Sequence, residues 1–221
     1  MLGSSKEDAM RRNECIIKLL FFISSLSIGS QLVFCSKPFP KGDEYLLLSV
    51  LQSGLGANSP TSFKYIFVTS GTSNGNLGGV SGADTICSAA KATDGESLPG
   101  TSTEYRALIV GTGRTAGGTG WPLHASTTYY KNYPNPTLVF STTSGALPSL
   151  PLNQALPGSA IHIWTGISST WTTGTTCLNW TDNTVGNTGE YGVSGATDIT
   201  SFNNLLADTC DTLNHLLCVR L

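Results

Sequence analysis

Charged residues are scarce in this chain. Asp, Glu, Lys and Arg together make up 12% of the 221 residues, against a usual share of about 25% in soluble proteins. The formal net charge is -2, and Lys and Arg form no cluster along the sequence. A protein that binds nucleic acid needs a basic face for the phosphates. The composition therefore excludes nucleic acid as a partner.

An uncharged run long enough to cross a bilayer is also missing from the N-terminal region. The run over residues 19–34 follows Arg11, Arg12 and Lys18, and it is shorter than the roughly 20 residues that a spanning helix needs. A basic segment followed by a short apolar run is typical of a signal peptide. We therefore expect residues 1–35 to be a signal peptide and the protein to be exported, with Met1 or Met10 as the start.

The signal peptide ends in a pattern that resembles a loose bacterial lipoprotein signal. Leu32 stands three residues before Cys35, although Phe34 occupies a position that usually takes a small residue. A lipidated cysteine carries more than one acyl chain, which is enough for stable membrane anchoring. We expect Cys35 to be lipidated and to hold the protein at the outer membrane or cell surface, with ordinary secretion as the alternative.

Export makes disulfides possible, because they persist in oxidising compartments. Four cysteines remain after the leader, and four cysteines allow three pairings. They are Cys87, Cys177, Cys210 and Cys218.

The mature chain divides into a linker over residues 36–60 and one domain over residues 61–221. Apolar and β-branched runs predict strands, and Ser81 with Asp84 resembles a capping pair that begins a short helix. That helix would carry Cys87 on its inner side. Short strands, one or two short helices and long loops predict an α+β domain. The predicted strands cover residues 62–70, 104–111, 137–142, 160–166 and 214–221.

Residues 111–136 form a Gly-rich segment with no helical period, which we call the aromatic loop. A loop of this length inside a small domain is usually functional or poorly ordered. Aromatic side chains and Arg dominate the energy of protein interfaces, but the same rings also form small satellite cores. Both interpretations remain open for its candidate partner-binding residues, which are Arg114, Trp121, His124, Tyr129, Tyr130, Lys131 and Tyr133.

No pattern in the sequence predicts a metal, a cofactor or catalysis. His124, His162 and His215 lie on separate segments without the spacing of metal ligands, and the carboxylates are scattered. Trp180 and Asp182 keep two letters of the Trp-Asn-Asp motif of sugar-binding C-type lectins, but no Glu-Pro-Asn or Gln-Pro-Asp triplet precedes them. We expect Trp180 to pack beside a disulfide of Cys177 and Asp182 to cap a loop.

Several motifs together resemble the endostatin-type C-type-lectin-like domain, and most of all the leptospiral endostatin-like outer-membrane lipoproteins. They are "IFVTSG", "GVSGADTICSAA", "EYRALIVG", "HIWTG", "CLNWTD" and "DTCDTLNHLLCVRL". The resemblance implies a twisted, mostly antiparallel sheet with short helices and long loops. It also implies nested disulfides, Cys87 with Cys218 and Cys177 with Cys210.

The same resemblance implies a function. Proteins of this kind bind host extracellular-matrix proteins such as laminin and fibronectin, and complement regulators such as factor H. The alternative is a carbohydrate-binding lectin, calcium-independent or degenerate, and the third reading is an uncharacterised enzyme. We expect a protein-binding module that requires no cofactor.

Overall fold

The computed structural model of the chain describes residues 63–221. The expected signal peptide, the lipidation of Cys35 and the linker over residues 36–60 lie outside these residues. Among the residues described, no helix is both long and apolar enough to cross a bilayer.

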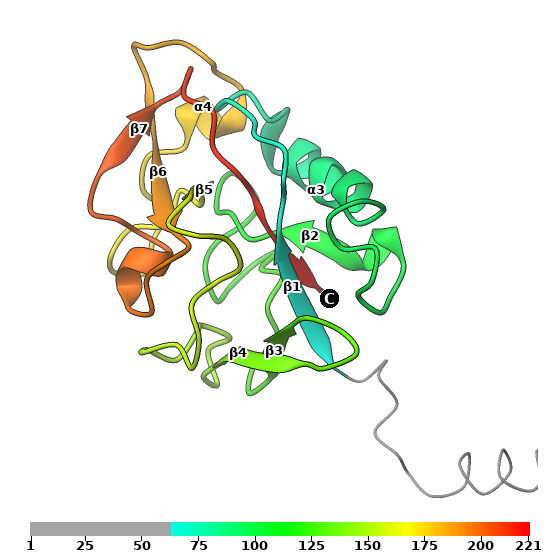
Figure 1. The fold of residues 1–221 in the computed structure, drawn as a ribbon. Coiled ribbons are helices and arrows are strands. Elements are labelled where there is room, and N and C mark those ends of the chain that lie inside the picture. The colour runs from blue at the N-terminus through cyan, green and yellow to red at the C-terminus, as the bar shows by residue number, and fades with distance from the viewer. Residues whose placement is uncertain (1–62) are drawn as a thin grey trace, which may run out of the picture. The chain divides into compact units, whose positions relative to one another are not determined.

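A five-stranded sheet forms the centre of the domain (Figure 1). Its order is β2-β8-β1-β3-β4, and all neighbours are antiparallel except β1 and β3, which run parallel. The C-terminal strand therefore lies between two strands from the N-terminal half of the domain. The strands are β1 (Lys64–Val68), β2 (Tyr105–Ala107), β3 (Thr128–Lys131), β4 (Thr137–Ser141) and β8 (Leu217–Arg220).

Both faces of this sheet are buried at its inner strands β1 and β8. In β1, Tyr65 and Phe67 point into one apolar cluster, whereas Ile66 between them points into a second cluster. In β8, Cys218 belongs to the first cluster and its neighbour Val219 to the second. Successive side chains of a strand point to opposite faces, so a strand covered on both sides reads as a continuous apolar run. This explains the sequences "YIFV" and "LLCV".

Helix α3 (Gly79–Ala90) covers the first face of the sheet. Its buried residues are Ala83 and Cys87, and Cys87 forms a disulfide with Cys218 of β8. The predicted capping pair is wrong. The helix begins at Gly79 after Gly78, whose φ of 79° suits glycine, and no side chain caps it. Asp84 instead binds Arg114.

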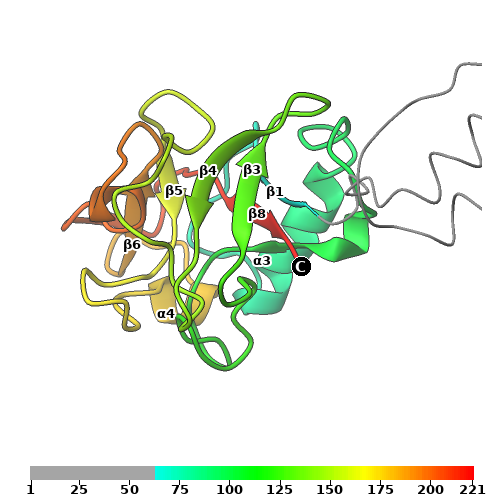
Figure 2. The ribbon, with the colours of Figure 1, turned by 90° about the horizontal axis from the view of Figure 1, so that it is seen from below.

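A second, three-stranded sheet has the order β5-β6-β7, all antiparallel. Figures 1 and 2 place it on the side of β1 and β8 that lies away from α3. Its strands are β5 (His162–Trp164), β6 (Thr188–Val193) and β7 (Ala207–Thr209). Short helical turns lie at α4 (Cys177–Trp180), η2 (Ser102–Glu104) and η3 (Ile199–Ser201).

The domain is α+β, as the sequence predicts. All five predicted strands are present, mostly shorter than expected, and three further strands were not predicted. Strand β3 lies inside the segment expected to be a loop, and β6 and β7 lie in polar sequence. The two disulfides join Cys87 to Cys218 and Cys177 to Cys210, which is the pairing that the resemblance implies.

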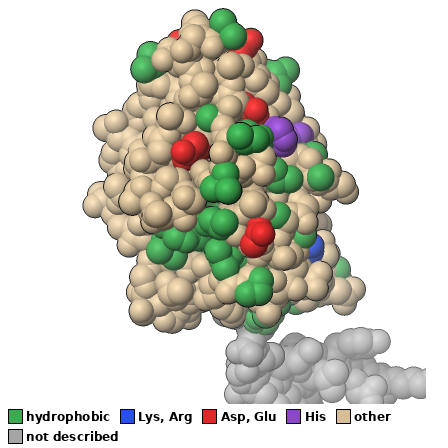
Figure 3. All heavy atoms as spheres, turned by 90° about the vertical axis from the view of Figure 1, so that its left-hand side faces the viewer, with side chains coloured by type: hydrophobic (Ala, Val, Ile, Leu, Met, Phe, Trp, Pro, Cys, Tyr) green, Lys and Arg blue, Asp and Glu red, His purple; other side chains and the backbone are tan. Residues whose placement is uncertain are grey.

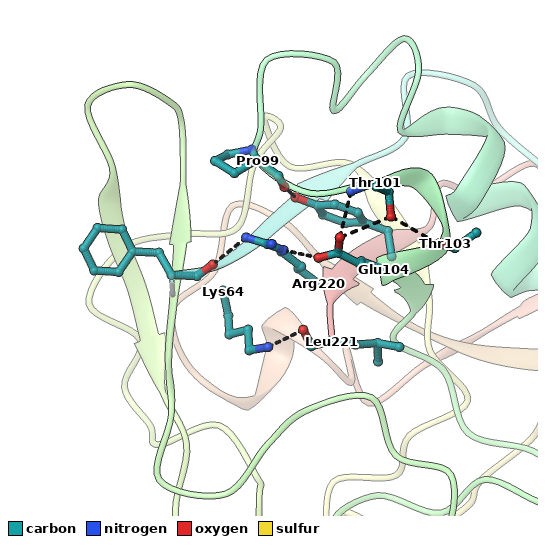
Figure 4. Close-up of polar contacts among 9 residues, drawn as sticks. Lys64, Pro99, Thr101, Thr103, Glu104, Arg220 and Leu221 are labelled. Carbon is teal, nitrogen blue, oxygen red and sulfur yellow. Dashed lines mark hydrogen bonds and ion pairs between the residues drawn. The ribbon is translucent and has the colours of Figure 1, made fainter. Parts of the chain in front are cut away.

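The end of β8 is anchored by polar contacts (Figure 4). The Arg220 guanidinium donates to Glu104 Oε2 over 2.7 Å and to the Phe63 carbonyl over 3.2 Å. Glu104 also accepts a hydrogen bond from the backbone N–H of Thr101. This N–H first, and Arg220 second, lower the pKa of Glu104 to about 2. The ammonium of Lys64 donates to the carbonyl of Leu221.

The two disulfides should differ in their contribution to stability. In the chain-entropy model, a cross-link stabilises more when it closes a longer loop, and the sequence separations are 131 and 33 residues. We expect Cys87→Ala with Cys218→Ala to lower the free energy of unfolding by about 5 kcal/mol, and Cys177→Ala with Cys210→Ala by about 4 kcal/mol. Urea unfolding of both double variants measures this, and a larger loss for the second pair would contradict the model.

Glu104 should make stability depend on acid pH. A carboxyl whose pKa is lowered in the folded state stabilises fully above its unfolded pKa, and this contribution is lost as the pH falls toward its folded pKa. For Glu104 the window runs from 4.5 down to about 2. We expect Glu104→Gln to cost about 1 kcal/mol or less at pH 6, since the pair is partly exposed. The difference from the unsubstituted protein should shrink across the window, as measured by urea unfolding; a constant difference would show that Glu104 does not titrate there.

Candidate functional site

The aromatic loop contributes several of its large side chains to the core. Its strand β3 places Tyr129 in the second apolar cluster, fully buried, with its ring stacked on Phe140 at a centroid distance of 5.0 Å. The Tyr129 hydroxyl accepts a hydrogen bond from the backbone N–H of His124 over 2.8 Å. Burial raises the pKa of Tyr129 to about 12. Of the two interpretations left open for Tyr129, this burial supports the core one.

Arg114 is also unavailable to a partner, because only 4% of it is exposed. Its two terminal nitrogens donate to both carboxylate oxygens of Asp84 over 2.9 and 2.7 Å, and one of them also donates to the Ala107 carbonyl. A paired and hydrogen-bonded charge is the form in which Arg is tolerated when buried. This ion pair ties the loop to α3, so the burial of Arg114 supports the core interpretation as well.

The remaining candidates of the aromatic loop divide into packed and exposed side chains. Trp121 is half-buried and donates from Nε1 to the Ala146 carbonyl, and Lys131 donates from Nζ to the Ala155 carbonyl. Tyr130 packs against Phe63 at a ring distance of 5.0 Å. His124 and Tyr133 are exposed, Tyr133 by 39%. Most of the candidate side chains are thus packed within the domain, and His124 and Tyr133 are the two that remain open to a partner.

The inner disulfide lies in a dense aromatic environment. Trp180 is fully buried in the same cluster as Cys177 and Cys210, and its ring lies 5.8 Å from that of Trp164. Its Nε1 donates to the Val110 carbonyl over 2.7 Å. A Cβ atom on Gly75 would lie 2.4 Å from Cys177 Sγ, so this position admits only glycine. The region "CLNW" is therefore a packed structural element.

Backbone strain is concentrated in this turn. All four residues of α4, including Leu178, have positive φ between 48° and 63°, a left-handed conformation that costs about 1–2 kcal/mol for each L-residue. Such strain persists only where the surroundings hold it. Here the disulfide and the buried ring of Trp180 do so. Leu178 itself is 63% exposed.

Asp182 follows the turn and orders the next loop. Its Oδ2 accepts hydrogen bonds from the Thr184 hydroxyl, the Thr184 N–H and the Asn187 amide. The Thr184 hydroxyl contributes most to lowering the pKa of Asp182. These are the contacts of a loop-capping carboxylate. Within residues 63–221, no three His, Cys, Asp or Glu side chains are placed to hold a metal ion.

One polar cluster was not predicted from the sequence. His162 of β5 contacts Asp208 of β7, with 3.0 Å between Nδ1 and Oδ2, and its ring stacks on Tyr191 at 4.1 Å. Asp208 also accepts from the Asn214 amide. The contact spans 46 residues, so no local pattern predicts it. It links the two outer strands of the three-stranded sheet.

Large apolar side chains are exposed around the three-stranded sheet. Leu205 and Leu206 directly precede β7, and Leu213 follows its end by four residues; we call these residues and the outer edge of β7 the β7 surface. Val185 lies between α4 and β6. Figure 3 shows hydrophobic and acidic side chains together on this side of the domain. The exposed fractions of Leu178, Val185, Leu205, Leu206 and Leu213 lie between 61% and 71%.

A protein family described as being of unknown function, DUF1554, matches residues 70–197 of the chain. None of the curated proteins matches it. The matched segment contains α3 and the left-handed turn, together with Asp182, whereas β7 follows it.

Replacing two tyrosines of the aromatic loop separates its core role from a surface role. We expect Tyr129→Ala to lower the free energy of unfolding by about 3–5 kcal/mol, because it leaves a cavity among buried rings. Tyr133→Ala should cost about 1 kcal/mol or less, as a substitution of an exposed side chain. Thermal and urea unfolding measure both; similar losses would show that the tip of the loop is as well packed as β3.

Proposed function

Because the chain belongs to the DUF1554 family, whose function is unknown, we propose its function from the structure: it is a protein-binding module that docks its partner on the β7 surface. Exposed apolar side chains that lie close together are typical of protein interaction sites. Single exposed leucines are common on protein surfaces, so exposure alone does not carry the proposal.

The backbone conformation of Leu205 carries it. This residue has a φ of 59° and is 67% exposed. A leucine in the left-handed region costs about 1–2 kcal/mol, and glycine would adopt the same conformation freely. Because the side chain of Leu205 is exposed, its packing within the domain offsets little of this free-energy cost. Strain of this kind is concentrated at functional sites. A hydrogen bond from Leu205 N–H to Asn203 Oδ1 holds this backbone in the free domain, and burial of the leucine side chain against a partner would offset its cost further.

The scaffold beneath the β7 surface is held firmly. The disulfide of Cys210 with Cys177 begins one residue after β7, and the Cys210 carbonyl accepts a hydrogen bond from Gly75 N–H over 2.7 Å. Asp208 is fixed by His162 and Asn214. A surface that is already ordered loses little conformational entropy on binding. The rigidity supports a role in recognition.

The partners that we propose come from the sequence resemblance. We propose that the domain is an endostatin-like, C-type-lectin-like module of the leptospiral type, exported by residues 1–35 and anchored through a lipid on Cys35. Its partners would then be laminin, fibronectin or factor H. The disulfide pairing, in agreement with that resemblance, supports the assignment.

Leu205→Gly tests the proposal without damaging the fold. We expect this substitution to leave the free energy of unfolding unchanged or raise it by about 1 kcal/mol, because it relieves a left-handed backbone. Affinity for immobilised laminin, fibronectin or factor H should fall about tenfold or more, because a leucine buried at an interface contributes roughly 1.5–3 kcal/mol.

Tyr133→Ser is the matched control, since it removes an exposed apolar side chain from the tip of the aromatic loop. We expect it to leave the affinity unchanged. Unchanged binding in Leu205→Gly, together with a loss in Tyr133→Ser, would move the binding site to the aromatic loop and overturn the proposal. Binding that a chelator abolishes and a free glycan competes would favour a lectin.

A further inference from the structure

We infer that the β7 surface takes a basic, extended segment of its partner, which adds to the three-stranded sheet along the outer edge of β7. The inference rests on the proposed function and specifies the chemistry of the partner. It is carried by the distribution of charge, by the open edge of the strand and by the leucines on both sides of it.

Charge is distributed unevenly between the two parts of the domain. Between residues 132 and 219 the sequence contains no Lys and no Arg, but it contains five acidic residues. The segment between residues 132 and 219 contains β4 to β7 and the loops around them. On the side shown in Figure 3, basic side chains reach only one margin. The five acidic residues are Asp182, Glu190, Asp198, Asp208 and Asp211.

No basic side chain among residues 63–221 forms a salt bridge with any of these five acids, apart from the contact between His162 and Asp208. Asp211 is exposed and lies between the end of β7 and Leu213. The end of the domain therefore presents uncompensated negative charge beside exposed leucines. A partner with Lys or Arg next to apolar side chains is complementary to both features, and charge complementarity guides association and selects partners.

The edge of β7 supplies backbone hydrogen-bonding groups. Among the residues described, β7 pairs only with β6, with Asp208 opposite Gly189. The N–H of Cys210 donates to the Asn187 carbonyl, and in an antiparallel pair the groups of alternate residues point to the same side. The backbone N–H and C=O groups of Asp208 therefore point toward β6, whereas those of Ala207 point outward.

An extended segment is the shape that such an edge accepts. In strand addition, the main-chain hydrogen bonds supply affinity and the alternate side chains supply specificity. Leu205 and Leu206 before the strand, and Leu213 after it, are placed to contact apolar side chains of the added segment. A second copy of this surface would carry the same negative charge, and anionic lipids and nucleic acids would be repelled in the same way.

Synthetic peptides test the inference on the full chain. The probe is a ten-residue peptide of alternating Lys and Val, and its controls are the matching Glu and Val peptide and the same Lys and Val peptide with N-methylated backbone amides. We expect the first peptide to bind about tenfold or more tightly than either control, in calorimetry at low salt. Its affinity should fall severalfold between 50 and 300 mM salt, because salt screens exposed charges.

Asp211→Lys should weaken the binding of the Lys and Val peptide, and Glu96→Lys is the matched control, since Glu96 is also an exposed carboxylate and follows α3. Equal binding of the Lys and Glu peptides would overturn the choice of a basic partner. Equal binding of the N-methylated peptide would overturn strand addition. Formation of a dimer on light scattering, with loss of peptide binding, would assign the edge to a second copy.

These outcomes are distinct from failure of the proposed function. If Leu205→Gly weakens binding to laminin, fibronectin or factor H, but Asp211→Lys and the peptides have no effect on it, the protein-binding function stands and the inference falls. If Leu205→Gly changes neither the binding of these three proteins nor the binding of the Lys and Val peptide, the β7 surface is not the binding site.

Discussion

The pairing of β8 between β1 and β2 is the constraint on which the rest of this domain depends. Strand β8 is the last strand of the described residues, yet it occupies an inner position in the sheet. Until it is in place, β1 and β2 have no common neighbour, and Cys87 of α3 has no disulfide partner. The disulfide of Cys87 with Cys218 ties the helix to this strand, and Arg220 ties its end to Glu104. The sheet therefore closes only when β8 is in place, and segments from both ends of the described region meet in it.

The second disulfide has a different role, because it stabilises a surface. It joins the left-handed turn at Cys177 to the residue after β7. With the burial of Trp180 and the close contact at Gly75, it holds loops that have little regular structure. The exposed leucines of the β7 surface, which gain little stabilisation from packing within the domain, lie on this braced region. The five-stranded sheet supplies stability, and the disulfide-braced end supplies a rigid surface that remains free to interact.

Electrostatics separate these two parts as clearly as topology does. Every Lys and Arg of the described residues precedes residue 132, except Arg220 of β8. Several of these basic side chains form contacts within the domain, such as the salt bridge of Arg114 with Asp84. The end with the three-stranded sheet has no comparable cations to neutralise its carboxylates. Its field therefore extends into solvent, where it favours a basic partner and discourages pairing with another copy of itself.

The sequence predicted much of the frame. The α+β class, five of the strands, the helix with Cys87 and, through the resemblance, both disulfides are present in the structure. Apolar runs and cysteines carry such information locally or through a known pattern. Strands β6 and β7 were missed because most of their residues are polar or glycine, and their pairing comes from neighbours distant in sequence. The prediction that Ser81 and Asp84 cap the helix was wrong because the Asp84 carboxylate pairs with the buried Arg114.

The candidate surface could not be predicted in the same way. Tyr129 and Tyr133 look equivalent in the sequence, but only the fold buries the ring of Tyr129 against Phe140 and leaves Tyr133 exposed at the loop tip. Leu205 looks like a core residue, and only the structure shows that it is exposed and has a left-handed backbone. The sequence by itself thus determined the fold class, the cysteines that brace it and the uneven placement of charge. The tertiary structure decided which aromatic and apolar side chains face solvent, because burial depends on long-range packing that no local pattern records.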